Sequence, residues 1–398
     1  MRKKQAFRPR WGGKPVSCPP RPRRRNGGTI IMLIKNAKIL AGKSFLEGDI
    51  RFGKTIEAVG RLEGQADLDA RGGYVVPGFV DIHTHGAMGE DFSDGKPEGI
   101  QPMADFYAAH GVTSYLATTM TLKEEVLTPA MHAIRDFRRV HGAKCAGVHL
   151  EGPFLSFAKR GAQAAENLHL PDTALFDRLN EASGGQVKLV TVACEEEGAM
   201  DFIGYVSQKA TVSLGHTSCS YDQAMEAFAR GASHATHLFN GMEGLHHRKP
   251  GILAAALDAG ASVELICDGL HIHPAVIRLV HRLYGDKLNL ISDSLRCAGM
   301  PDGQYELGGQ PIEVKNHKAT LLGTDTLAGS SISLVDAVRN VVAFGLPLAD
   351  ALYAASTAPA RAVGLTDVGA IRTGAAADLV VLDEKLDIQA VYVDGERQ

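Results

Sequence analysis

The sequence predicts an α/β protein with two parts: a (β/α)8 TIM-type barrel and a small β-sandwich that both ends of the chain build together. The first observation is an alternation of strand and helix patterns through residues 78–363, with eight strand candidates. Eight such units in series are typical of a parallel barrel. The second observation is a set of short strand patterns at residues 32–77 and 364–398. A doubly wound parallel sheet is the alternative for the central part.

The start of the chain, residues 1–31, differs in composition from the rest. Its first 30 residues hold ten of the 42 Lys and Arg and no Asp or Glu. High charge combined with proline buries too little apolar surface to fold, so we expect a disordered basic extension before a natural start at Met32. A targeting peptide or a nucleic-acid arm is the alternative. The rest of the chain holds 32 basic and 45 acidic residues, which argues against nucleic-acid binding by the folded body.

The overall composition fits a globular protein with a large core, since 45% of the residues are hydrophobic and 22% are charged. No apolar run reaches the roughly 18 residues that a membrane span requires. The six cysteines show no C-x-x-C spacing, and four of them lie in or beside apolar runs. That usage predicts buried thiols and a cytoplasmic location rather than a disulfide framework.

Short alternating runs separated by glycine define the first end of the chain. They are Met32–Leu40, Gly48–Phe52, Thr55–Val59 and Tyr74–Val76. Alternating runs with glycine turns indicate strands. The other end repeats the pattern at residues 377–383 and 388–393. We therefore expect the two ends to pair into one β-sandwich.

Eight apolar runs supply the strands of the central part. They are Phe79–His85, Thr113–Thr119, Cys145–Glu151, Val187–Ala193, Thr211–His216, Ser233–Phe239, Ser262–Cys267 and Leu288–Asp293. Helical patterns lie between them, among them residues 99–110, 123–141, 172–181, 221–230 and 273–284. The long connection at residues 296–326 contains three strand-like runs, which indicate an inserted hairpin.

Side chains that bind metals stand at the ends of five of these strands. They are His83 and His85 in the first strand, Glu151 in the third, His216 in the fifth, His237 in the sixth and Asp293 in the eighth. The carboxyl ends of barrel strands meet on one face, and residues two apart in a strand share a side. Alone, each is explained by a buried structural histidine or a carboxylate that caps a helix. Together they predict a metal site.

Several motifs, in this order, resemble those of the N-acetylglucosamine-6-phosphate deacetylases of the amidohydrolase superfamily. They are Pro77–His85, His149–Phe154, Ser213–Thr217, Thr236–Met242, His246–Arg248, Asp268–His271, Leu327–Ser330 and Gly374–Val380. The resemblance runs from about Met32 to the end of the chain. It implies hydrolysis of the N-acetyl group of N-acetylglucosamine 6-phosphate to glucosamine 6-phosphate and acetate, a step of amino-sugar catabolism.

The resemblance also implies roles for the metal-type residues. The main metal site would consist of Glu151, His216 and His237, and the pair His83 and His85 would add a second. Zinc is the first choice and iron the second, with one or two ions per subunit. Metal-bound hydroxide would be the nucleophile. Asp293 would be the acid and base, and His271 would polarise the carbonyl group.

Substrate contacts follow from the same resemblance. The positions that match are Ala162, Asn240, Gly241, Arg248, His271, Leu327, Ala328, Gly329 and Ser330. In the family the basic residue can come from a neighbouring subunit, so we expect a homodimer with Arg248 near its interface. Two departures from the family pattern are Gln163 in place of a histidine and Gly241 in place of an alanine.

Other functions stay open on the sequence alone. The enzyme could act on the N-acetylgalactosamine epimer or on a different amide, such as a cyclic one. Many cyclic-amide hydrolases carry a carboxylated lysine at the fourth strand, which here ends Val192-Ala193-Cys194-Glu195 without one. A sugar-phosphate sensor is the non-enzyme alternative, and the presence of Asp293 argues against it, since binding needs no proton shuttle.

Overall fold

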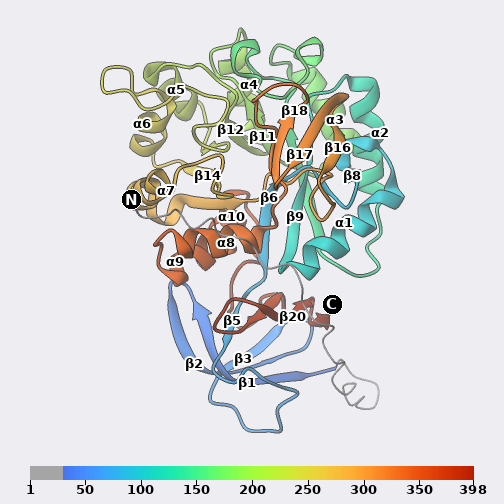
Figure 1. Ribbon diagram of the computed structural model, residues 1–398, viewed down its shortest axis with the longest axis vertical. Coiled ribbons are helices and arrows are strands. Elements are labelled where there is room, and N and C mark those ends of the chain that lie inside the picture. The colour runs from blue at the N-terminus through green and yellow to red at the C-terminus, as the bar shows by residue number, and fades with distance from the viewer. Residues whose placement is uncertain (1–29) are drawn as a thin grey trace.

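The computed structural model describes residues 30–398, so the expectation for the basic extension falls almost wholly outside the described part. Figure 1 shows a part with helices and strands above a layer of strands. Strands from both ends of the chain, coloured blue and red, lie together in that lower layer. The predicted two-part architecture is confirmed, and the residue boundaries between its parts stay a prediction.

Eight parallel strands form the barrel, one for each candidate. They are β6 (Phe79–Thr84), β9 (Val112–Thr119), β10 (Lys144–Glu151), β11 (Val187–Val192), β12 (Thr211–Leu214), β13 (His234–Ala235), β14 (Ser262–Ile266) and β15 (Leu288–Ile291). They pair in chain order from β6 to β15. That order excludes a doubly wound sheet, in which the chain starts in the middle. β13 is shorter than expected because His237 and Phe239 have positive φ.

The barrel closes between its first and last strands, just beyond the regular ladder. The amide of Asp293 donates to the carbonyl of His83 at 2.9 Å, and the amide of His85 donates to the carbonyl of Ser294 at 2.8 Å. Three of the predicted metal-site residues therefore hold the seam of the barrel with their own backbone.

Helices connect the strands and cover the outside of the barrel. They are α1 (Pro97–Ala109), α2 (Glu124–Asp136), α3 (Thr173–Ala182), α4 (Ala199–Val206), α5 (Tyr221–Ala229), α6 (Gly251–Asp258), α7 (Pro274–Tyr284), α8 (Leu334–Ala343), α9 (Leu348–Ala354) and α10 (Thr357–Ala362). Local sequence explains where several begin. Proline at the first position starts α1 and α7, and Ser220 forms a capping box with Gln223 at the start of α5.

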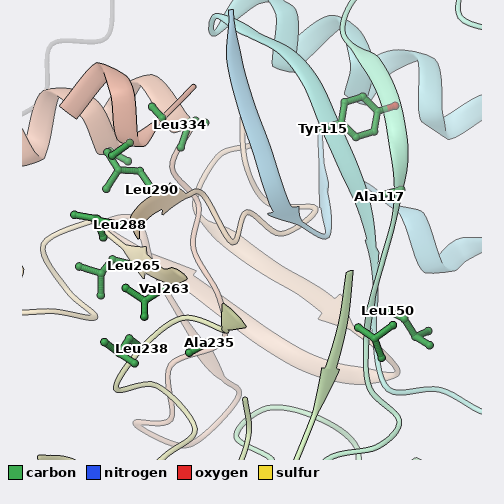
Figure 2. Close-up of a cluster of buried hydrophobic side chains, with 14 of the residues drawn as sticks. Tyr115, Ala117, Leu150, Ala235, Leu238, Val263, Leu265, Leu288, Leu290 and Leu334 are labelled. Carbon is green, nitrogen blue, oxygen red and sulfur yellow. The ribbon is translucent and has the colours of Figure 1, made fainter. Parts of the chain in front are cut away.

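Apolar side chains fill the space between the strands and the helices. Figure 2 shows part of this core, with Val263 and Leu265 of β14 beside two leucines of β15. Leu334 at the start of α8 belongs to the same buried cluster. Burial of each such side chain contributes roughly 1.5–3 kcal/mol. Because side chains alternate along a strand, Glu264, between Val263 and Leu265, points to the opposite face of β14.

The lower domain is one mixed sheet built from both ends of the chain. Its strands are β1 (Met32–Ala41), β2 (Ser44–Phe52), β3 (Ile56–Gly60), β4 (Leu68–Asp69), β5 (Tyr74–Pro77), β19 (Leu379–Leu382), β20 (Ile388–Val393) and β21 (Glu396–Arg397). The sheet curls on itself, because Thr55 bridges Ala376 as well. A separate apolar core that includes Phe52 and Tyr392 lies within this domain.

The inserted segment folds as expected into an antiparallel sheet, β16 (Gly303–Leu307), β17 (Gln310–Lys315) and β18 (Lys318–Leu321). Its apolar face packs against Met120, Ala162 and Leu295. A two-stranded sheet, β7 (Gly86–Ala87) and β8 (Glu90–Asp91), follows the first barrel strand.

Two bulk expectations can be checked on the described residues. The five cysteines after residue 29 are free thiols, and four of them are buried, as predicted. Within residues 30–398, no helix combines the length and the apolar character that crossing a bilayer would need.

Candidate metal centre

The Glu151 carboxylate, at the end of β10, lies at the middle of a cluster of imidazoles. Its Oε1 atom is 2.9 Å from His237 Nε2 and 3.3 Å from His216 Nε2. These two histidine nitrogens lie 3.1 Å apart. All three side chains are nearly buried. The structure therefore brings together the predicted main ligand set.

The second predicted pair approaches the same carboxylate from the first strand. His83 Nε2 lies 3.3 Å from Glu151 Oε1, and His85 Nε2 lies 3.1 Å from Glu151 Oε2. Asp293 Oδ1 is 3.5 Å from His83 Nε2 and 3.3 Å from His85 Nε2. Asp293, predicted as the acid and base, is thus also placed to act as a metal ligand with the two histidines.

The distances fit a metal centre. Two atoms held 2.0–2.1 Å from a tetrahedral zinc ion lie about 3.3 Å apart. The separations around Glu151 Oε1 are close to that value, between 2.9 and 3.3 Å. In addition, the buried Nε2 atom of His83 faces the cluster without a hydrogen-bond partner among the described residues. A divalent cation would satisfy that atom.

The charges of the cluster shift its pKa values strongly. Burial lowers the pKa of His85, but hydrogen bonds to Asp293 and Glu151 outweigh it and raise the pKa to about 9. Burial raises the pKa of Glu151, but the charge of His83 and the hydrogen bonds from its histidines hold that pKa well below the usual range. In the metal-free protein His85 therefore favours its protonated form, and a cation bound at that ring must displace the proton.

The backbone at three ligand positions is strained. His216 and Asp293 have φ of 47°, and His237 has φ of 23°. Left-handed backbone at residues other than glycine costs about 1–3 kcal/mol each and gathers at functional sites. The turn directs each side chain inward at the point where its strand ends.

The predicted substrate positions lie on loops beside the ligands. The amide of Ser330 donates to the carbonyl of Asp293 at 2.8 Å. This bond holds the preceding turn, Leu327–Gly329, next to the end of the last barrel strand. A Cβ atom at Gly329 would lie 2.8 Å from that same carbonyl. The Ala162 carbonyl accepts a hydrogen bond from Gln310 of the inserted sheet.

Gly241 and Asn240 lie against the main ligand set. Asn240 Nδ2 donates to the carbonyl of His237 at 3.2 Å. A Cβ atom at Gly241 would be 2.8 Å from His216 Nδ1 and 3.1 Å from the carbonyl of Lys159. His216 Nδ1 donates to that carbonyl at 2.8 Å, which leaves its Nε2 atom free for a cation. Glycine at position 241 therefore leaves room for the ring of His216 and for the Lys159 carbonyl that orients it.

His271 and Arg248 have contrasting surroundings. His271 Nδ1 donates to Asp268 Oδ2 at 2.7 Å, and the imidazole is almost buried. Arg248 lies on the exposed segment Glu243–Lys249, where its guanidinium bonds to His247 Nε2 at 2.7 Å. Its predicted place at a subunit interface stays a prediction.

Two contacts of the centre were not predicted from the sequence. Gln163 Nε2 donates to Glu151 Oε2 at 2.9 Å, while its own oxygen accepts the amide of Thr121. Glu264 contacts His83 Nδ1 at 2.9 Å. The signal for Glu264 was a carboxylate in the middle of an otherwise apolar strand. The signal for Gln163 was its departure from the family pattern. That departure did not indicate that Gln163 contacts Glu151.

A further group of possible ligands lies at the ends of the neighbouring strands β11 and β12. Cys194, Glu195 and Cys219 offer ligand atoms that all lie within 4.8 Å of one another. Glu195 is already occupied, because the amide of Ser218 donates to its Oε1 at 2.5 Å and the hydroxyl of Thr217 donates to its Oε2. The group containing Glu151 is the better cation site, since it combines more ligands.

Comparisons with known proteins point to one family. Residues 74–397 match the model of the amidohydrolase family. The chain is 37% identical over 327 residues to the N-acetylgalactosamine-6-phosphate deacetylase of Escherichia coli O157:H7, covering 80% of this chain and 86% of the relative. It is 34% identical over 350 residues to the N-acetylglucosamine-6-phosphate deacetylase of Vibrio furnissii, covering 86% and 88%.

A solved structure is similar over nearly the whole chain. It is a variant of the N-acetyl-D-glucosamine-6-phosphate deacetylase from Mycobacterium smegmatis in complex with N-acetyl-D-glucosamine 6-phosphate. The TM-score is 0.88 at 35% identity, with 93% of this chain and 99% of that chain covered.

We predict that Gly241→Leu weakens zinc binding by about 10–100-fold, the usual effect of disturbing the support of a ligand. The added side chain is larger than the alanine of the family pattern and would press on His216 and on the Lys159 carbonyl that orients it. Zinc affinity measured by competition with a chromophoric chelator checks this. Gly244→Leu is the matched control, because Gly244 is exposed and a Cβ atom there meets nothing within 4 Å. Equal affinities for the two variants would contradict the assigned role of His216.

Proposed function

The chain belongs to the amidohydrolase family, and from that premise we propose that it removes the acetyl group of N-acetylglucosamine 6-phosphate, giving glucosamine 6-phosphate and acetate. The observation that carries this proposal is the joint placement of Glu151, His216, His237 and Asp293 at the carboxyl ends of four barrel strands. This is a ligand set for a hydrolytic cation with a carboxylate beside it. The named relatives supply the substrate class.

The residues divide the reaction among them. A bound divalent cation, held by Glu151, His216 and His237, would acidify a water molecule and polarise the amide. Asp293 accepts the proton of the water as it attacks the acetyl carbon. The C–N bond then breaks, and Asp293 returns the proton to the leaving amine. In the metal-free protein the charge of His83 and the hydrogen bond and charge of His85 counter the effect of burial and keep the pKa of Asp293 low, and a bound cation would act in the same direction.

His271 would stabilise the developing oxyanion. A carboxylate only accepts hydrogen bonds, so the contact with Asp268 places a proton on His271 Nδ1. The Nε2 atom then donates only when the ring is protonated. Burial lowers the pKa of His271, but the hydrogen bond and charge of Asp268, with Asp293 adding to them, outweigh it and raise that pKa. The donor form therefore persists to higher pH.

We further propose zinc as the cation, a homodimer in which Arg248 binds the phosphate group, and a cytoplasmic location. Imidazole and carboxylate suit zinc, and iron is the second choice. The exposed position of Arg248 leaves it accessible to a second subunit. Ala162, Asn240, Gly241 and the turn at Leu327–Ser330 would surround the sugar. The buried free thiols agree with a reducing compartment.

The galactosamine epimer is the second candidate substrate. The E. coli relative that acts on it by name is 37% identical to this chain, a level similar to that of the glucosamine enzymes. The two sugars differ in one hydroxyl configuration, and both present the same acetamide to the metal centre.

Acetate release is the direct test of the proposed function. N-acetylglucosamine 6-phosphate, N-acetylgalactosamine 6-phosphate and N-acetylglucosamine would be offered to the enzyme before chelation, after chelation and after zinc is restored. We expect zinc-dependent release from the phosphorylated glucosamine derivative and little from the free sugar. Faster release from the galactosamine derivative would select the second candidate. Turnover without any metal, or equal turnover of the free sugar, would contradict the proposal.

We also predict that Asp268→Ala moves the alkaline limb of the kcat profile to lower pH. Asp268 favours the protonated ring of His271, so removing its charge lowers the pKa of His271. The donor is then lost earlier as the pH rises. Because Asp268 also accepts hydrogen bonds from the backbone amides of Leu270 and His271, thermal unfolding of the variant checks that the loop and the fold are intact. An unchanged alkaline limb, measured on zinc-loaded enzyme, would remove His271 from the mechanism.

A further inference from the structure

A carboxylate lies inside the barrel one layer below the metal centre. Glu264 is fully buried in the middle of β14, a strand that is otherwise apolar apart from its first residue. Its neighbours Val263 and Leu265 belong to the core under the helices, as Figure 2 shows. Glu264 therefore points into the barrel, toward the ligand-bearing strands. Burying a charged carboxylate costs several kcal/mol, so this position calls for an explanation.

Glu264 contacts both halves of the centre. Its Oε2 atom accepts from His83 Nδ1 at 2.9 Å and from the backbone amide of His237 at 3.1 Å. Its Oε1 atom lies 3.1 Å from His234 Nε2. His234 is in turn fixed by Ser262, whose hydroxyl lies 2.5 Å from the other ring nitrogen. The carboxylate is thus held firmly and presents one oxygen to the ring of His83.

That contact decides how His83 faces the cluster. A carboxylate accepts but does not donate, so the proton of the neutral His83 ring resides on Nδ1. The Nε2 lone pair then points to the side where Glu151 and Asp293 lie. This is the arrangement in which a ligating histidine gives its other N–H to a carboxylate, which fixes its orientation and raises its basicity.

We propose that Glu264 is the positioning residue that orients His83 for the second cation site, which the pair His83 and His85 would form. The inference rests on the proposed metal centre and deepens it. The first cation would be bound by Glu151, His216 and His237. It depends less on Glu264, because Glu264 contacts only the backbone amide of His237 among these three residues. The ring of His216 is oriented by the Lys159 carbonyl instead.

Zinc stoichiometry of purified protein tests this without any substrate. Wild type, Glu264→Gln and Glu264→Leu would be stripped of metal, titrated with zinc against a chelator, and assayed for bound zinc by elemental analysis. We expect two zinc ions in the wild type. In Glu264→Gln the affinity for the second ion should fall about 10–100-fold while the first is unchanged, and in Glu264→Leu the second ion should be lost.

The matched control is Asp378→Asn, which removes the charge of a buried carboxylate in the lower domain, where Asp378 pairs with Lys144 at 2.7 Å. It should bind two zinc ions like the wild type. Gln is the mild variant, because its oxygen can still accept from His83 Nδ1. Thermal unfolding of the metal-free proteins identifies a variant that fails to fold.

Several results would overturn the inference. They are a single zinc ion in the wild type, two ions of unchanged affinity in Glu264→Gln, or equal weakening of both ions, which would mark Glu264 as a general support of the barrel. A wild type that binds no zinc would overturn the metal centre itself. Metal-dependent acetate release with one bound ion would leave the proposed function standing and remove the role of Glu264 alone.

Discussion

The interaction on which the rest of the site depends is the burial of the Glu151 carboxylate among four imidazoles. A carboxylate withdrawn from water costs several kcal/mol unless charges and hydrogen bonds surround it. Here His83, His85, His216 and His237 all lie within 3.3 Å of its oxygens, and Gln163 donates to one of them. In the metal-free state the protonated form of His85 offsets part of the negative charge, and a divalent cation can replace that proton. The same contacts thus keep the folded barrel intact and create the cation site.

The barrel makes this cluster possible because strands distant in sequence end on one face. The seam adds a second constraint, since the backbone amides of His85 and Asp293 close the barrel. A shift of register there would move two side chains of the centre at once. Left-handed backbone at His216, His237 and Asp293 directs these three side chains toward the inside of the site. Geometry of this kind is rigid, which suits a site that must hold a cation and a proton carrier together.

Much of this arrangement could be predicted from the sequence. Period-two apolar runs and their alternation with helices indicate eight strands, and residues at strand ends on one barrel face must converge. The convergence of Glu151, His216 and His237 follows from that rule, and their grouping as the main ligand set was implied by the family resemblance. Contacts across the interior do not follow from the rule, because they depend on strand register and on side-chain rotation. Glu264 and Gln163 reach the centre through such contacts. For the same reason the proximity of Asp293 to the two histidines of the first strand could not be read from spacing.

The way in which the sheet of the terminal β-domain closes is a second feature that could not be predicted from the sequence. The strand patterns at both ends indicate a shared β-domain, and their alternation is the same for one curled sheet as for two stacked ones. The hydrogen bonds of residues 54–56 with residues 374–377 decide how the sheet closes. Those bonds join backbone atoms, and residues 374–377 have the sequence Gly-Ala-Ala-Ala, which carries little pattern.

The most direct test of the central claim is the position of the cation. Crystals grown with zinc would be measured on both sides of the zinc absorption edge, and the anomalous difference map would locate the ion. We predict a peak within about 2.0–2.2 Å of Glu151 Oε1, His216 Nε2 and His237 Nε2. An absence of density among these three atoms, with zinc bound instead at Cys194 and Cys219, would contradict the account.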